Sequence, residues 1–298
     1  MRPEITVLDI QGQFRVYTEF YRADAAEKTI ILVNGSLATT ASFAQTVRNL
    51  YPQFNVVLYD QPYAGKSKPH NLNATPLTKE MEGQILLELI DHFNAEHIMS
   101  FSWGGAAALV ALSHRPQRIE KAVISSFSPV INEHMRDYLE RGVLHLGAHA
   151  RYEVGNLVND TIGKHLPPLF KRVNYRHVSS LETHEYDQMH FHISHVLNLD
   201  QNEYLNAAKN INVPVLFMNG EWDEYTAPAD ARLFAPVVND STFITIQATG
   251  HFLDMEHKAA CRDSRFALLD YLTPVKSTRS RATYHYRQAS TDHHALAL

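Results

Sequence analysis

The 298-residue sequence has little cysteine, no excess of basic charge and no long apolar run. A single cysteine, Cys261, cannot form an internal disulfide, so nothing points to an oxidising compartment. The 27 Lys and Arg residues are outnumbered by 32 Asp and Glu residues, and a net charge of −5 excludes the basic surface that nucleic acid requires. The apolar runs, such as Ile30–Val33, are far shorter than the roughly 20 residues that span a bilayer. We therefore expect a cytoplasmic protein with no transmembrane segment and no nucleic-acid partner.

What is present is an alternation of short β-branched runs with longer stretches of helical spacing. Continuous apolar runs such as Ile30–Val33 are typical of strands buried in a parallel sheet. The predicted strands span residues 29–34, 55–59, 97–101 and 121–126, and the predicted helices between them span 42–51, 77–93 and 106–113. This alternation predicts an α/β fold with a mostly parallel sheet flanked by helices, preceded by an antiparallel strand pair at 5–10 and 14–21.

The strand pattern is interrupted after Pro129 and returns at residues 214–218, followed by a strand at 241–247 and a helix at 255–272. The interruption contains helical patterns at 133–144, 153–162 and 185–197, with a break at Pro167-Pro168. We expect a catalytic core of residues 1–129 and 207–273, a helical cap of residues 130–206 inserted after the sixth strand, and a disordered tail at 274–298.

Ser102 lies at the turn between the predicted strand 97–101 and the helix that follows it. Small residues stand two positions before it, at Ser100, and two positions after it, at Gly104. Such a turn strains the backbone of a nucleophile so that its hydroxyl projects above the sheet, and bulky neighbours would collide with the strand and the helix. The pattern is typical of the nucleophile elbow of the α/β-hydrolase fold, with serine in place of the usual first glycine.

An activated serine needs a base within hydrogen-bonding reach and an acid that orients this base. In this fold the acid and then the histidine follow the serine in the sequence. Asp223 follows the predicted strand 214–218 and His251 follows the strand 241–247, so both are expected at the carboxyl edge of the sheet. Other candidates in these loops are Glu221, Glu224 and Asp230 for the acid, and His257 for the base.

Two backbone N–H groups are expected to form an oxyanion hole, which stabilises a tetrahedral intermediate. One belongs to Trp103, directly after the nucleophile, and the other to Ser36 in the loop that follows the strand 29–34. The loop at residues 60–67 is expected to be a rigid structural turn.

The sequence resembles one family from about residue 32 to residue 272. The segments that carry the resemblance are Asn34-Gly35, Ser102-Trp103-Gly104-Gly105, Lys164-His165-Leu166-Pro167-Pro168, Trp222-Asp223-Glu224-Tyr225-Thr226 and Thr249-Gly250-His251-Phe252-Leu253-Asp254. They resemble the 3-(3-hydroxyalkanoyloxy)alkanoate synthases (HAA synthases) of rhamnolipid biosynthesis, in the α/β-hydrolase superfamily. That family also has a small residue other than glycine at the position of Ser100.

The resemblance implies an acyltransferase that joins two 3-hydroxyacyl thioesters, carried on acyl carrier protein or coenzyme A, into a 3-(3-hydroxyalkanoyloxy)alkanoate. This ester would be the lipid precursor of rhamnolipids and would pass to a downstream rhamnosyltransferase. Ser102 would attack one thioester with His251 as base, and the 3-hydroxyl of the second substrate would then attack the acyl-enzyme. No cofactor is expected. The residues alone leave two alternatives open: a thioesterase, esterase or lipase of the same fold, and a non-catalytic lipid-binding protein.

The predicted cap supplies candidates for holding the substrate and its carrier. The residues expected to line an enclosed, dry site are Met135, Tyr138, Leu144, Met189 and Phe191. Residues 161–181 contain four basic residues and no acid, and an acidic carrier or coenzyme A phosphates are expected to dock there. These basic residues are Lys164, Lys171, Arg172 and Arg176. Peripheral attachment to the inner membrane is a further expectation for the location.

Nine of the 18 histidines fall in the predicted cap, among them His190, His192 and His195. On one helix His192 and His195 share a face, whereas His190 lies about 200° around the helix from His192. We therefore expect no metal site at this cluster.

Overall fold

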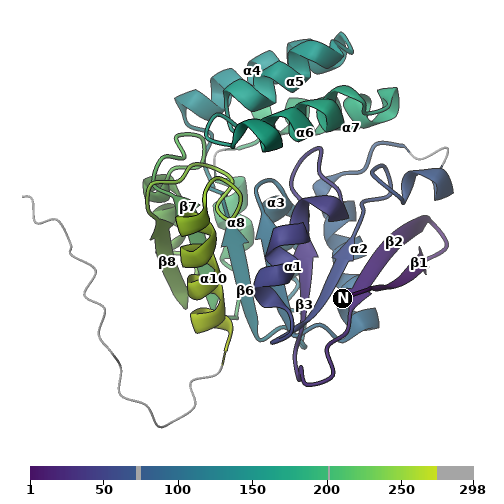
Figure 1. The fold of residues 1–298 in the computed structure, drawn as a ribbon, viewed down its shortest axis with the longest axis vertical. Helices are drawn as coiled ribbons and strands as arrows, with labels where there is room; N and C mark the ends of the chain where they lie inside the picture. Colours follow the sequence, from purple (N-terminus) through teal and green to yellow (C-terminus); the bar gives the residue numbers. More distant parts are fainter. Residues whose placement is uncertain (72–74, 201, 274–298) are drawn as a thin grey trace, which may run out of the picture.

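The computed structural model describes residues 1–71, 75–200 and 202–273, which form one eight-stranded sheet with helices on both faces (Figure 1). The strand order is β1-β2-β4-β3-β5-β6-β7-β8. The strands are β1 (Glu4–Ile10), β2 (Phe14–Tyr21), β3 (Thr29–Val33), β4 (Asn55–Tyr59), β5 (His97–Phe101), β6 (Lys121–Ser125), β7 (Val215–Gly220) and β8 (Ser241–Ile246). β2 runs antiparallel to both β1 and β4, and the pairs from β4 to β8 are parallel, which confirms the predicted α/β sheet.

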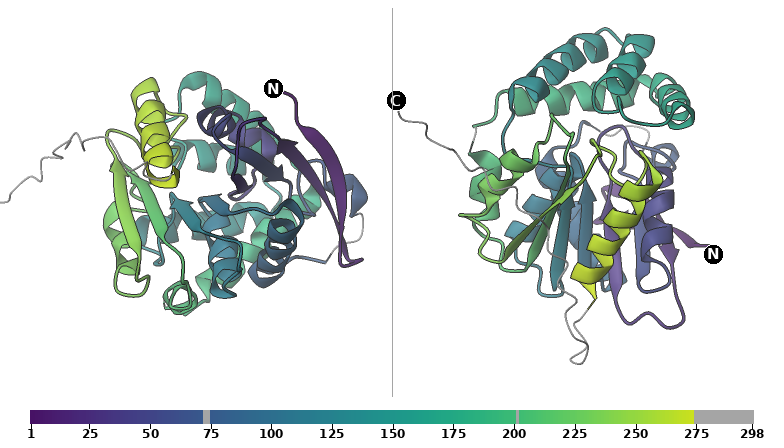
Figure 2. Two further views of the ribbon diagram at one scale, coloured as in Figure 1. Left: turned by 90° about the horizontal axis from the view of Figure 1, so that it is seen from below. Right: turned by 60° about the vertical axis from the view of Figure 1, so that its left-hand side comes forward.

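Side chains of the sheet alternate between two apolar layers. Ile30 and Leu32 point to the layer that includes α1 (Ala44–Leu50) and α10 (Lys258–Leu272), the helix drawn in yellow on one face of the sheet in Figure 2. The intervening residues of β3 point to the opposite layer, which includes α2 (Lys79–Phe93), α3 (Gly104–Ser113) and α8 (Glu203–Ala208). All of β3 is buried because helices cover both faces, as its continuous apolar run predicts. The short helix α9 (Pro228–Ala231) follows β7.

Four helices lie together over the carboxyl edge of the sheet, in the upper part of Figure 1 and of the right-hand view in Figure 2. They are α4 (Glu133–Gly147), α5 (Arg151–Asp160), α6 (Pro168–Ser179) and α7 (Thr183–Leu197), and we call them the cap. The cap has its own apolar cluster, which includes Leu139, Val158, Tyr186 and Ile193. The limits 130–206 for a separate cap domain stay a prediction, and the tail at 274–298 lies outside the described residues.

The predicted break at Pro167-Pro168 is present, because α5 ends at Asp160 and α6 begins only at Pro168. Pro168 is the first residue of α6, a position where its missing N–H costs no hydrogen bond and its fixed φ favours a helix. The prolines therefore begin a helix that the apolar spacing alone does not predict.

Buried polar contacts tie the cap to the core. The Nζ atom of Lys68, in the core, lies 2.8 Å from Oε2 of Glu185 at the start of α7. Gln188 on α7 accepts from the Leu77 N–H at 2.8 Å and donates to the Leu77 carbonyl at 2.8 Å. These contacts fix α7 above the loop that precedes α2. Among the described helices, none combines the length and the apolar character needed to cross a bilayer.

Candidate active site

Ser102 lies at a sharp turn between β5 and α3. Its φ of 51° is in the left-handed region, which residues other than glycine rarely occupy. A Cβ atom at Gly104 would lie 2.4 Å from the carbonyl oxygen of Asn34, and one at Gly105 would lie 2.7 Å from Cγ of Phe127. Helix α3 can therefore approach the sheet this closely only with glycine at both positions. The sharp turn between strand and helix places Ser102 at the carboxyl edge of the sheet.

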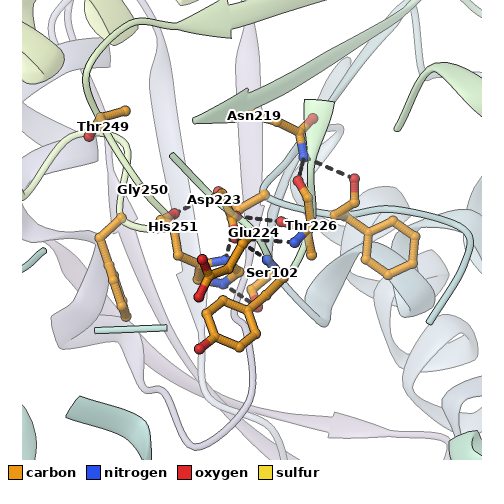
Figure 3. A network of polar contacts seen from close by, with 12 residues as sticks. Ser102, Asn219, Asp223, Glu224, Thr226, Thr249, Gly250 and His251 are labelled. Carbon is orange, nitrogen blue, oxygen red and sulfur yellow. Dashed lines mark hydrogen bonds and ion pairs between the residues drawn. The ribbon is translucent and has the colours of Figure 1, made fainter. Parts of the chain in front are cut away.

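The structure brings Ser102, His251 and Asp223 into one line of hydrogen bonds, shown in Figure 3. Nε2 of His251 lies 2.9 Å from Oγ of Ser102, and Nδ1 of His251 lies 2.8 Å from Oδ2 of Asp223. Both His251 and Asp223 are buried, with 2% of each residue exposed. The arrangement allows His251 to accept the hydroxyl proton of Ser102 while its other nitrogen donates to Asp223.

Asp223 is held as a carboxylate by its neighbours. Burial alone would raise the pKa of Asp223, but the charge and hydrogen bond of His251 and the hydrogen bonds from Thr226 lower it below its ordinary value of 3.8. The N–H groups of Tyr225 and Thr226 each donate to Oδ1 of Asp223 at 3.1 Å, and the Thr226 hydroxyl donates to Oδ2. Asn219 holds this loop by donating to the Thr226 carbonyl at 2.8 Å (Figure 3). Asp223 is therefore ionised at neutral pH.

The other candidate acids and the other candidate base have partners elsewhere. Of the acids, Glu221 accepts from the Ala248 N–H at 2.7 Å, and Glu224 pairs with Lys164 at 2.7 Å. Asp230 accepts from the Asn132 amide group at 2.8 Å. The alternative base, His257, caps α10 by accepting from the Ala260 N–H at 3.2 Å. The geometry favours Asp223 and His251 over these alternatives.

The loop that carries His251 is held by Glu256, a buried residue that no motif predicts. Its carboxylate accepts from the N–H groups of Gly250 at 2.7 Å and Phe252 at 3.0 Å, the residues on either side of His251. It also accepts from the Thr249 hydroxyl at 3.0 Å. Three donors on one carboxylate fix the backbone of His251 and hence the direction of its ring. The only signal in the sequence is an acid five residues after the histidine.

The two candidate oxyanion donors lie at the same cavity as Ser102. Ser36 and Trp103 both line this cavity, and among the described residues neither of their N–H groups donates to a backbone carbonyl. Leu37, next to Ser36, has a φ of 57°, and its carbonyl oxygen lies 2.7 Å from Nε2 of His177 on α6. A cap helix therefore contacts the loop on which one oxyanion donor is expected.

The cavity at Ser102 has a volume of about 180 Å³ and extends into the interior of the cap. Three of the predicted lining residues, Met135, Tyr138 and Met189, do line it. Leu144 does not, because it is 71% exposed, and Phe191 faces a second, smaller pocket instead. Leu144 follows the cavity-lining residue Gly142 by two positions, and Phe191 likewise follows Met189. Two positions turn a side chain about 200° around the helix, so both point away from the cavity.

The structure separates the four basic residues predicted to dock the carrier. Lys164 is paired with Glu224 at 2.7 Å and precedes α6, whereas Lys171, Arg172 and Arg176 belong to α6. Arg172 and Arg176 are exposed and Lys171 is half-buried. Only the residues of α6 therefore form one surface.

The cap histidines have different surroundings. His192 is buried and its Nε2 lies 2.6 Å from the Leu77 carbonyl, while His195 is exposed beside the second pocket. Burial lowers the pKa of His192 to about 4, so its ring is neutral. Within the described residues, no three His, Cys, Asp or Glu side chains are grouped so that they could hold a metal ion.

The comparisons with known proteins agree with this geometry. The profile of the alpha/beta hydrolase fold family matches residues 28–258. Among solved structures, a hydrolase from Pseudomonas aeruginosa is similar with a TM-score of 0.74 at 20% identity, covering 91% of this protein and 99% of that one. The enol-lactonase from Burkholderia xenovorans also has a TM-score of 0.74, at 17% identity, covering 90% of this protein and 100% of that one. These likenesses confirm the predicted fold.

Closer relatives carry one name, "(R)-3-hydroxydecanoyl-ACP:CoA transacylase". The protein of this name from Pseudomonas putida is 66% identical and that from Ectopseudomonas oleovorans 65% identical, each over the full length of both proteins. The one from Pseudomonas aeruginosa is 58% identical over 93% of this protein and 92% of its own length. A transacylase is an acyltransferase, the class of enzyme that the sequence predicts. The chain therefore belongs to the α/β-hydrolase fold family and, within it, to the group of acyltransferases named (R)-3-hydroxydecanoyl-ACP:CoA transacylase.

Proposed function

We propose that this enzyme takes a 3-hydroxyacyl group from acyl carrier protein onto Ser102 and then passes it to a second substrate. The names of the full-length relatives give the acyl group, the donor and, as one acceptor, coenzyme A. The observation that carries the mechanism is the hydrogen-bonded line from Ser102 to Asp223, with distances of 2.9 and 2.8 Å, at the base of a mostly apolar cavity. The nucleophile and the space for an acyl group therefore lie together.

In the first half of the reaction Ser102 Oγ attacks the thioester carbonyl while His251 accepts its proton. The negative charge on the carbonyl oxygen is stabilised by the N–H groups of Trp103 and Ser36, and the resulting imidazolium is stabilised by the charge of Asp223. The C–S bond then breaks, and the carrier thiolate leaves with the proton from His251. The product of this half is an ester of Ser102.

In the second half an acceptor attacks this ester, again with His251 as base. The relatives' names give the thiol of coenzyme A as acceptor, which yields a 3-hydroxyacyl-CoA. The family resemblance of the sequence gives a second acceptor, the 3-hydroxyl of another 3-hydroxyacyl thioester. Its attack forms the ester bond, returns the proton to Ser102 through His251 and leaves the 3-(3-hydroxyalkanoyloxy)acyl group on the second carrier. Hydrolysis of this remaining thioester by water then releases the 3-(3-hydroxyalkanoyloxy)alkanoate and the carrier thiol. That product would supply a downstream rhamnosyltransferase. Both acceptors use one acyl-enzyme, so one site serves either reaction.

Transfer requires that the acceptor reacts faster than water. Well-oriented reactants reach effective molarities of about 10⁵ to 10⁸ M, so a bound acceptor outcompetes water if the cavity holds it in place. The cap residues Met135, Tyr138 and Met189 are proposed to enclose the acyl group and keep water out. We place the reaction in the cytoplasm, and attachment to the inner membrane is a separate proposal.

The test is an analysis of products from purified protein supplied with 3-hydroxydecanoyl-acyl carrier protein, with and without coenzyme A. We expect 3-hydroxydecanoyl-CoA when coenzyme A is present, and the dimeric ester if the 3-hydroxyl also serves as acceptor. The Ser102→Ala variant, which lacks the nucleophile, should form neither. Free 3-hydroxydecanoic acid as the main product under both conditions would make the protein a thioesterase and would overturn the proposal.

A further inference from the structure

One face of helix α6 exposes apolar side chains to solvent. Leu169, Arg172, Val173 and Arg176 recur at the i, i+3, i+4, i+7 spacing that places four residues on one side of a helix. Leu169 and Val173 are each 57% exposed, and both arginines are exposed. We call these four residues the α6 stripe. Leu169 and Val173 are neighbours on the helix surface, and exposed apolar residues that adjoin one another beside polar ones are typical of interaction surfaces.

The charge along the α6 stripe has one sign. Residues 161–181 contain no acid. Among the described residues, neither Arg172 nor Arg176 forms an ion pair. Lys164, by contrast, is already paired with Glu224 at 2.7 Å. The stripe therefore presents two uncompensated guanidinium groups beside two apolar side chains, which fits an acidic partner that also has an apolar contact surface.

The opposite face of α6 belongs to the catalytic cavity. Asn174, His177 and Val178 line this cavity, and His177 contacts the Leu37 carbonyl at 2.7 Å, next to Ser36. A helix with its side chains is about 10 Å across, so a partner seated on the stripe lies one helix diameter from the cavity. A long, flexible arm that carries a thioester bridges such a distance.

We propose that the α6 stripe is the docking surface for acyl carrier protein in the half of the reaction that loads Ser102. The proposal rests on the proposed function, in which this acidic protein is the acyl donor. Coenzyme A has phosphates for the arginines but no apolar surface that would cover Leu169 and Val173, so it is not the occupant. An anionic membrane offers both negative charge and an apolar interior, but it does not deliver a thioester to Ser102. Membrane binding is therefore measured as an alternative in the experiment below.

The experiment compares the double variant Arg172→Glu, Arg176→Glu with the unaltered protein on two donors. One donor is 3-hydroxydecanoyl-acyl carrier protein, and the other is the N-acetylcysteamine thioester of the same acid, which has no protein surface. We expect KM for the carrier-bound donor to rise by about tenfold and to lose its dependence on salt, because both stripe charges are reversed. The kcat/KM for the small thioester and the KM for coenzyme A should stay within about twofold of their unaltered values.

A matched control reverses two other cap arginines, Arg136→Glu and Arg141→Glu, which lie on α4 and should leave both donors unaffected. A second variant, Leu169→Ser with Val173→Ser, keeps the charge and should also raise KM only for the carrier-bound donor.

Equal losses of kcat/KM on both donors, or an unchanged KM for the carrier-bound donor, would overturn the docking proposal. The proposal would also be overturned if the unaltered protein bound phosphatidylglycerol vesicles and the Arg172→Glu, Arg176→Glu variant did not, while the KM for the carrier-bound donor was the same in both proteins. Inactivity of the unaltered protein on both donors would instead contradict the proposed function.

Discussion

At the scale of single residues, the reactivity proposed for Ser102 depends on groups from two separate loops, one after β7 and one after β8. In the proposed mechanism His251 and Asp223 supply the base and its orienting charge, and Glu256 accepts hydrogen bonds from the peptide N–H groups on both sides of His251. Since Asp223 keeps its negative charge through the contacts of His251 and Thr226, we expect it to stabilise the protonated form of His251 in the proposed attack by Ser102.

The role of His251 can be tested without any natural substrate. A fluorophosphonate probe should label Ser102 of the unaltered protein, and His251→Ala should slow labelling by at least about 100-fold, because removal of a general base costs roughly 10²- to 10⁴-fold. The control is His257→Ala, a histidine that caps α10 and should label at the normal rate. Undiminished labelling of the His251→Ala variant, measured by gel fluorescence, would refute the assignment.

The sequence predicts these candidate catalytic residues because the fold fixes their order and places each at the end of a strand. The supporting residues could not be predicted in this way. The contact between Leu37 and His177 joins residues 140 positions apart, and no periodicity connects them. Glu256 acts on backbone N–H groups, which every loop has, so its partners leave no signature in the sequence.

At the scale of elements, the sheet could be predicted more closely than the cap. Continuous apolar runs such as β3 have one stable environment, a sheet covered on both faces. A cap helix instead divides its side chains between the cavity, its own core and solvent, and apolar residues occur in all three. Leu144 and Leu146 on α4 illustrate this, because one is 71% exposed while the other is 2% exposed.

The contact between α7 and the core should make stability depend on pH through His192. Its pKa is lowered from 6.5 to about 4, so below pH 6.5 the unfolded protein binds a proton that the folded protein excludes. Stability should therefore fall as the pH drops from 6.5 to about 4, by about 3 kcal/mol in the free energy of unfolding. Urea unfolding should show this loss in the unaltered protein and not in His192→Gln. The exposed His195→Gln variant is the control, and parallel pH curves for all three proteins would contradict the prediction.

Gly142 on α4 should limit the length of the acyl group that fits. It lines the cavity, and a Cβ atom there would meet Cδ1 of Ile193 at 3.4 Å, an ordinary contact. Gly142→Leu should thus fold but fill part of the cavity, and kcat/KM should fall by about tenfold more for a 3-hydroxydecanoyl than for a 3-hydroxybutanoyl donor. Leu144→Gln, on the solvent side of the same helix, should leave the ratio unchanged. An equal loss on both donors would show that the acyl group does not reach Gly142.

At the scale of the whole molecule, we propose that the sheet edge carries the reacting residues and that the cap determines which substrates reach them. The fold is shared with hydrolases of 20% identity or less, so the sheet and its nucleophile do not by themselves favour transfer over hydrolysis. We propose that the preference for transfer comes from the cavity between the sheet edge and the cap, which would enclose the acyl group and hold the acceptor. In the proposed mechanism both acceptors react with the same intermediate, an acyl group carried on Ser102.

This acyl-enzyme provides the most direct test of the account. The protein is mixed with 3-hydroxydecanoyl-acyl carrier protein, quenched in acid, and its mass is measured intact and after digestion. We predict a gain of one 3-hydroxydecanoyl group on the peptide that contains Ser102, and its release as 3-hydroxydecanoyl-CoA when coenzyme A is added before the quench. An acyl group on any other residue, or its release only as the free acid in the presence of coenzyme A, would contradict the account.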